Sequence, residues 1–65
     1  MLTPERIRKQ YGDYLCRRCI NRLYGLNLEK EDCRYGYYYK CRQCQQERHI
    51  VVGFTASGKL KTLLK

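Results

Sequence analysis

The chain has 65 residues, of which 43% are hydrophobic and 31% are charged, so we predict one small folded domain over residues 1 to 65 and neither a disordered tail nor a membrane span. A domain of this size rarely buries enough apolar surface to fold without a disulfide or a metal, and it has no room for a large substrate cavity. Fourteen Lys and Arg against six Asp and Glu leave a formal charge of +8, which favours an anionic partner.

The N-terminal residues predict a short helix over residues 4 to 11. Thr3 is a typical N-cap, proline suits the first turn, and Gly12 is a typical helix stop. Its few apolar residues indicate a helix that leans on the domain through a narrow stripe. Because no apolar run of the signal-peptide kind appears here, we expect the chain to stay in a reducing compartment, the cytoplasm.

Two C-x2-C pairs are the strongest signal in the chain. Cys16 and Cys19 form the first pair, Cys41 and Cys44 form the second, and 21 residues separate the two pairs. Two thiolates three positions apart can grip one ion from a single turn, and two such turns complete the tetrahedral four-sulfur shell that zinc accepts. Four protein ligands leave no open position, so we predict one structural Zn²⁺ rather than a catalytic metal.

The fifth cysteine makes the count odd, which excludes a fully disulfide-paired monomer. We interpret Cys33 as a small buried apolar residue or an unused thiol. His49 follows the second pair closely and remains an alternative ligand or a donor to the sulfurs. A thiol-disulfide redox site is disfavoured because such motifs belong to larger α/β domains.

The segments around the cysteine pairs predict two metal-holding β-hairpins, over residues 14–24 and 34–55. The second hairpin ends in a β-branched run, Ile50 to Val52. Residues 27 to 32 are acidic and poorly periodic, which indicates a surface loop. The expected fold is therefore small, zinc-stabilised and mostly β: two metal-holding hairpins with a short N-terminal helix.

The C-terminal segment, residues 56–65, is predicted as a strand that pairs back, with a helical turn as the alternative. Gly58 supplies the positive φ that a tight hairpin needs. Leu60, Leu63 and Leu64 have a spacing that suits a helical turn as well as a strand.

Strand alternation divides the tyrosines before Cys41. Tyr35, Tyr37 and Tyr39 share the face of Cys41 and are interpreted as core and rim packing. The other face carries Arg34, Tyr38 and Lys40, a basic and aromatic combination of the kind that holds single-stranded nucleic acid.

Arginines within the cysteine turns add a second basic feature. Arg17, Arg18 and Arg42 would gather at one end of the domain and form a phosphate-binding edge, or would balance the thiolates. Because a four-thiolate zinc centre carries about two negative charges, the net charge falls only to about +6. The predicted nucleic-acid contacts are therefore Arg17, Arg18, Arg34, Tyr38, Lys40 and Arg42.

The two cysteine turns on hairpins resemble the zinc ribbon, and the resemblance covers residues 14 to 55. Zinc ribbons often carry a glycine after the second cysteine of each turn, where Ile20 and Gln45 stand here. The first turn is followed by Asn21-Arg22-Leu23 and the other by Arg48-His49-Ile50-Val51, a pattern that resembles the phage Com-type small zinc proteins. That resemblance implies messenger RNA binding and translational regulation.

Three functions follow as hypotheses. The first is a zinc module that binds RNA or single-stranded DNA. The second is an adaptor or accessory subunit, in which an acidic protein partner meets the basic surface and the C-terminal leucines anchor it. The third is electron transfer by a rubredoxin-like iron site. We expect no enzyme activity, because the chain has one His and Ser57 has no visible base partner. We also expect no small-molecule substrate and no membrane partner.

Overall fold

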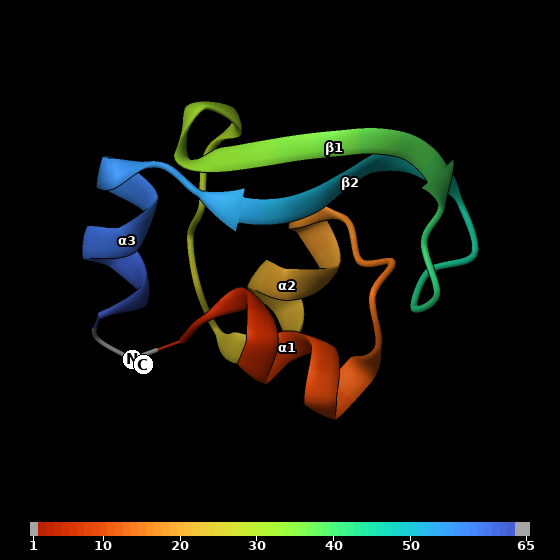
Figure 1. Ribbon diagram of the computed structural model, residues 1–65, viewed down its shortest axis with the longest axis horizontal. Helices are drawn as coiled ribbons and strands as arrows, with labels where there is room; N and C mark the ends of the chain where they lie inside the picture. Colours follow the sequence, from red (N-terminus) through yellow and green to blue (C-terminus); the bar gives the residue numbers. More distant parts are fainter. Residues whose placement is uncertain (1, 64–65) are drawn as a thin grey trace.

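The centre of the fold is an antiparallel pair of strands, β1 (Cys33–Lys40) and β2 (Glu47–Phe54), with helices below it and at one end (Figure 1). The computed structural model describes residues 2–63. Helices α1 (Pro4–Tyr11) and α2 (Arg17–Tyr24) lie under the strands, and α3 (Ala56–Thr62) closes the end (Figure 1). The expectation of a mostly β fold is therefore wrong, because more of the described residues lie in helices than in strands.

The N-terminal helix has the predicted bounds. The Thr3 hydroxyl accepts a hydrogen bond from the backbone N–H of Arg6 at 3.2 Å and so satisfies one of the free donors of the first turn. Gly12 ends the helix with φ 97°, a conformation that favours glycine. Ile7 is the one residue of α1 that is buried, which agrees with the narrow apolar stripe.

The first predicted hairpin, over residues 14–24, is wrong, because most of that segment is helix α2. Cys19, Ile20, Leu23 and Tyr24 pack inward, and their spacing is that of a helix face. Gly25 caps the helix in the left-handed conformation, φ 63°. The prediction failed because the metal motif was assumed to sit on strands.

Residues just before α2 still join the sheet. Cys16 forms an isolated antiparallel bridge with Ile50, and the backbone N–H of Val51 donates to the Leu15 carbonyl at 3.0 Å. β2 is therefore bordered by β1 on one side and by this short segment on the other. This pairing brings the first cysteine pair alongside the second hairpin.

The second hairpin is present, but its register is irregular. The pairing of β1 with β2 shifts between Arg34 and Tyr35 and again between Tyr35 and Tyr37. Such a bulge breaks the alternation of faces along a strand. As a result Tyr35 contacts the ring of His49, as Tyr38 does, whereas Tyr37 packs on Tyr14. The predicted common face of Tyr35, Tyr37 and Tyr39 is therefore wrong.

The predicted surface loop over residues 27–32 contains a 3₁₀ turn, η1 (Lys30–Asp32), which ends in a buried acid. The Asp32 carboxylate accepts hydrogen bonds from Lys61 Nζ at 2.6 Å, from Ser57 Oγ at 2.6 Å and from the Glu29 N–H at 2.7 Å. These bonds, from Lys61 first, lower the pKa of Asp32 to about 2. Its carboxylate therefore joins η1 to α3 at neutral pH.

The predicted C-terminal strand is wrong and the helical alternative is right. Thr55 is the N-cap of α3, and its hydroxyl accepts from the Gly58 N–H at 3.4 Å. Gly58 does not form the predicted turn. It allows α3 to lie directly against the backbone of Asp32, where a side chain would not fit. Leu64, one of the three predicted leucines, lies outside the described residues.

The core joins residues from almost every element. The buried apolar side chains are Leu2, Ile7, Leu15, Cys16, Cys19, Ile20, Leu28, Cys33, Cys41, Ile50 and Phe54. Three of the four residues in the two cysteine pairs belong to this core, and Cys44 packs against it half-buried. Among residues 2–63 there is no helix with the length and apolar character needed to cross a bilayer.

We predict that Gly58→Ala destabilises the fold. An added Cβ would overlap the carbonyl oxygen of Asp32, and the backbone would have to move. Overpacking of this kind costs about 1 to 3 kcal/mol, more than the gain of about 1 kcal/mol that alanine usually brings to a helix. Thermal unfolding of the metal-loaded protein measures the effect.

Gly53→Ala is the matched control. A Cβ at Gly53 meets only the Arg34 side chain, at 3.7 Å, and the backbone there does not need a positive φ. Its melting temperature should stay within about 3 °C of the wild-type value. Equal melting temperatures for the two variants would contradict the close contact between α3 and η1.

Candidate metal centre and adjoining cleft

The two cysteine pairs meet in one cluster. The Sγ atoms of Cys16, Cys19, Cys41 and Cys44 all lie within 4.8 Å of one another. Cys16 and Cys44 are separated by 3.9 Å, and Cys19 and Cys41 by 3.5 Å. A tetrahedral ion with metal–sulfur bonds of about 2.3 Å separates its sulfurs by about 3.8 Å. The four cysteines therefore have the spacing to hold one metal ion with no vacant coordination position.

Two different backbone structures present the pairs. Cys16 precedes α2 and Cys19 lies in its first turn, whereas Cys41 follows β1 and Cys44 lies in the turn before β2. The Cys16 N–H points at the Cys41 sulfur, 3.4 Å away. An N–H donor of this kind stabilises a thiolate. The cluster therefore joins the start of a helix to the end of a hairpin, rather than two hairpins.

The second cysteine turn keeps a glycine-like conformation without a glycine. Gln45 is the only non-glycine residue in the described chain with a positive φ, 64°, and its N–H donates to the Cys41 carbonyl at 2.9 Å. Ile20, the equivalent residue of the first pair, lies inside α2. The glycines typical of zinc ribbons are therefore absent for two different reasons. In the second turn Gln45 adopts the left-handed conformation itself, and in the first the chain continues as a helix.

The acidities of the thiols differ within the cluster. Burial raises the pKa of Cys16. Partial burial acts in the same direction on Cys44, but hydrogen bonds from the Gln46 N–H and from the neighbouring thiols outweigh it and lower the pKa of Cys44 to about 6. Because thiolates are the metal ligands, protons compete with the metal, and metal affinity falls as the pH falls.

The two remaining candidate ligands lie elsewhere. Cys33 starts β1, is 6% exposed and lies outside the cluster, and burial raises its pKa to about 11. It agrees with the interpretation as a small apolar core residue. His49 is exposed and lies between tyrosine rings rather than in the sulfur cluster.

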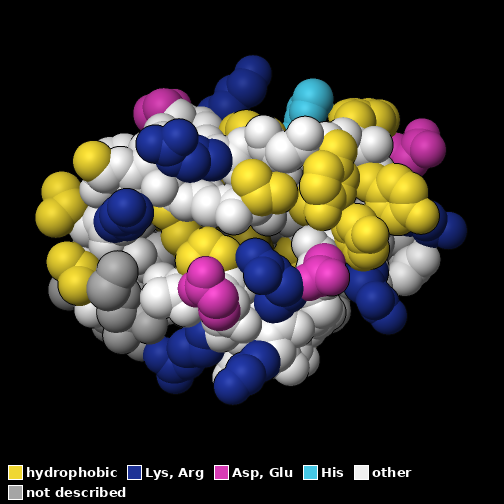
Figure 2. Space-filling model, in the orientation of Figure 1, with side chains coloured by type: hydrophobic (Ala, Val, Ile, Leu, Met, Phe, Trp, Pro, Cys, Tyr) yellow, Lys and Arg dark blue, Asp and Glu magenta, His cyan; other side chains and the backbone are white. Residues whose placement is uncertain are grey.

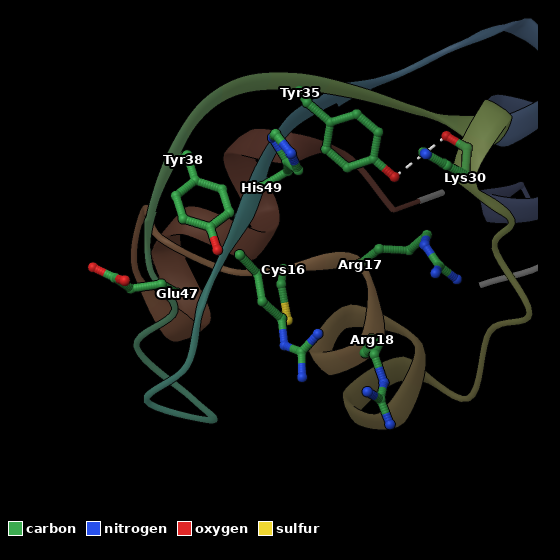
Figure 3. Close-up of a pocket in the computed structure, with 9 residues that line it drawn as sticks. Cys16, Arg17, Arg18, Lys30, Tyr35, Tyr38, Glu47 and His49 are labelled. Carbon is green, nitrogen blue, oxygen red and sulfur yellow. Dashed lines mark hydrogen bonds between the residues drawn. The ribbon is translucent and has the colours of Figure 1, made fainter.

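A cleft of about 590 Å³ opens beside the cluster (Figure 3). Figure 3 shows Tyr35, His49 and Tyr38 on one side of it, with Arg17 and Arg18 on the other. The Tyr38 hydroxyl points into the space between them. The residues that line the cleft are Cys16, Arg17, Arg18, Lys30, Tyr35, Tyr38, Glu47, Arg48 and His49. They combine four cations with one acid and three rings.

The structure brings together half of the predicted nucleic-acid contacts. Arg17, Arg18 and Tyr38 line the cleft.

The other three are not among the residues that line it. The Arg34 side chain packs beside Gly53 and the Arg42 side chain beside Gly12. Lys40 lies opposite Glu47 in the register of the hairpin. Of the predicted basic face of Arg34, Tyr38 and Lys40, the cleft therefore contains only Tyr38.

Four residues that line the cleft were not among the predicted nucleic-acid contacts: Lys30, Tyr35, Arg48 and His49. Arg48 and His49 lie opposite Tyr39 and Tyr38 in the hairpin register. The predicted second hairpin already placed the two strands side by side, so its register would have identified Arg48 and His49 as neighbours of the predicted contact Tyr38.

A second hollow, of about 320 Å³, continues the basic surface over the cysteines. Its lining residues are Arg18, Cys19, Arg22, Cys44, Gln46 and Arg48. Arg18 and Arg48 line both hollows, so these two arginines stand between the aromatic cleft and the sulfur cluster. Three arginines can serve there both to balance thiolate charge and to bind phosphate.

Another group of tyrosines lies on a different part of the hairpin. The Tyr14 ring is 4.8 Å from that of Tyr39 and 5.8 Å from that of Tyr37, measured between centroids. Tyr37, Tyr38 and Tyr39 are 46 to 60% exposed. In Figure 2, hydrophobic side chains gather over the end of the hairpin away from α3, near the single histidine. Tyr37, Tyr38 and Tyr39 thus form surface, whereas Tyr14 and Tyr35 are partly buried against the core.

Comparisons of the chain with protein-family models, with curated proteins and with solved structures find no match.

We predict that Cys41→Ser abolishes stoichiometric metal binding. Cys41 is fully buried, and the loss of a ligand should lower metal affinity by more than about 100-fold, because even changes around the ligands cost 10- to 100-fold. Native mass spectrometry of protein purified under reducing conditions measures the bound metal.

Cys33→Ser is the matched control, since it removes a buried thiol outside the cluster. This variant should retain one equivalent of metal. Loss of metal from Cys33→Ser alone, with retention in Cys41→Ser, would place the metal elsewhere.

Proposed function

We propose that the protein is a zinc-stabilised module that binds single-stranded nucleic acid, RNA or single-stranded DNA. The observation that carries this proposal is the cleft beside the cysteine cluster, in which four cations face three aromatic rings. Cations attract the phosphates, and exposed rings stack on unpaired bases. A duplex hides its bases, so the rings favour single strands.

The cations of the cleft are available for an external anion. Among residues 2–63, the side chains of Arg18 and Arg48 have no hydrogen-bond or salt-bridge partner. With Arg22 in the adjoining hollow, they extend the positive surface beyond the cleft. Arg17 is partly committed, because its guanidinium donates to the Leu28 carbonyl at 2.9 Å.

Zinc is the metal that we assign to the cluster. Four thiolates in a closed tetrahedral shell are the typical structural zinc site. Iron in the same shell would give a rubredoxin-like redox centre, the alternative that the donor set also permits. A net charge of +8 and a cleft built from arginines and tyrosines serve anion binding rather than electron transfer.

A protein adaptor is the second candidate function. Leu60 lies on α3 and Leu63 directly follows it, and they are 68% and 55% exposed. Helix α3 lies at the opposite end of the molecule from the turn between β1 and β2 (Figure 1). Exposed leucines on a short helix are a typical apolar anchor for a protein partner. This surface is separate from the cleft, so the two functions can be tested independently.

We predict that the purified protein is colourless and carries one equivalent of zinc. Iron bound by four thiolates absorbs visible light, whereas zinc has a filled d shell and does not. Metal analysis and an absorption spectrum decide between them. Chelation of the metal should also abolish cooperative unfolding, because three of the four ligands are core residues.

We predict that Arg18→Gln combined with Arg48→Gln weakens binding to a single-stranded oligonucleotide by at least about 10-fold at low salt. If both contact phosphates, the slope of log affinity against log salt falls by about 2. Fluorescence anisotropy across a salt titration, with single-stranded RNA, single-stranded DNA and duplex DNA, measures both quantities.

Arg34→Gln combined with Lys40→Gln is the charge-matched control, because it removes two positive charges from outside the cleft. Its affinity should fall by less than about 3-fold. If the two double variants weaken binding equally, only the total charge matters and the cleft is not the site. Absence of binding by the wild type at low salt would contradict the proposed function altogether.

A further inference from the structure

The three rings of the cleft form a slot. The His49 ring lies between two tyrosine rings, with centroids 5.9 Å from Tyr35 and 5.0 Å from Tyr38. The interplanar angles are 66° and 72°, so each tyrosine stands steeply to the histidine ring (Figure 3). In an edge-to-face pair the edge of one ring covers one face of the other, so a planar ligand can stack on the ring faces that these contacts leave uncovered.

The neighbouring contacts hold this slot in place. The Tyr35 hydroxyl donates to the Lys30 carbonyl at 3.3 Å, which ties the ring to η1. Tyr38 and His49 are directly opposite in the β1–β2 register. The slot is thus built on a paired hairpin and one hydrogen bond, and its form does not depend on a loop.

The charges around the slot select the ligand class. Aromatic rings grouped in this way also suit an organic cation, but Arg17, Arg18, Lys30 and Arg48 line the same cleft and would repel it. An acidic peptide would satisfy the cations and leave the rings without a partner. A nucleotide satisfies both, because it joins a planar base to an anionic phosphate.

We propose that the cleft receives one unpaired nucleotide, whose base stacks in the slot of Tyr35, Tyr38 and His49 and whose phosphate binds Arg18 and Arg48. This inference rests on the proposed function and makes it specific: one nucleotide of the strand is held apart from its neighbours. The volume of about 590 Å³ is in the range of sites that hold one small organic ligand. A base inside a duplex cannot enter without leaving its stack.

His49 supplies the probe, because it is the only histidine of the chain. Its ring protons give signals that report on the slot alone. The zinc-loaded protein is titrated with AMP, GMP, CMP and UMP and, separately, with inorganic phosphate. We expect the nucleotides to shift the His49 signals and to bind about 5- to 100-fold more tightly than phosphate, the gain that one stacked base brings.

Tyr38→Leu tests the stacking directly. This change keeps an apolar side chain and removes the ring, and Tyr38 is 60% exposed, so the fold should not depend on it. Nucleotide affinity should fall to that of phosphate, and phosphate affinity should stay unchanged. Tyr37→Leu is the control, because Tyr37 packs on Tyr14 outside the cleft and should leave nucleotide binding unchanged.

The outcomes separate this inference from the proposed function. If oligonucleotides bind but mononucleotides bind no more tightly than phosphate, the nucleotide slot is wrong and the proposed function stands. If neither binds, both are wrong. If an acidic peptide shifts the His49 signals and nucleotides do not, the cleft belongs to a protein partner.

Discussion

Convergence of the four cysteines is the constraint on which the rest of this structure depends. A chain of 65 residues buries few apolar side chains, and three of its core positions belong to the sulfur cluster. Cys16 and Cys19 belong to the start of a helix, whereas Cys41 and Cys44 belong to the turn of a hairpin. An ion bound by the four sulfurs would hold these two ends together, and would therefore also fix the distance between α2 and the strands. The cleft lies across that junction, so its width would depend on that ion.

Irregular pairing in β1 has the next largest consequence. Regular alternation would place Tyr35 with Tyr37 and Tyr39 and leave Tyr38 alone on the other side. The register shifts on either side of Tyr35 bring it to His49 instead, beside Tyr38. These irregularities thus add Tyr35 to the pair of Tyr38 and His49 and make a group of three rings. Bulges commonly redirect side chains in this way, and they do so without any change in residue composition.

The molecule separates its charges by position. The one buried acid, Asp32, is paired with Lys61, holds η1 to α3 and is not among the residues that line the cleft. Arg18 and Arg48 are left without an acidic partner in the described chain, next to thiolates that a metal would partly neutralise. A surface with a strong positive charge and open rings is suited to an anion that is also planar. Three of its arginines line the same hollow as Cys19 and Cys44, where positive charge favours thiolates as well as phosphate.

The sequence by itself determined which cysteines cluster, the helix over residues 4 to 11 and the second hairpin, because each depends on local chemistry: thiol spacing, a cap with a proline, and a β-branched run. Only the tertiary structure decided the rest. Residues 17–24 become a helix because one face packs inward, which a motif-based interpretation ignores. Gly58 is needed for a close approach to Asp32, not for a turn. The complete cleft could not be predicted because its residues come from four elements, and because local patterns do not encode the irregular pairing that brings Tyr35 to His49.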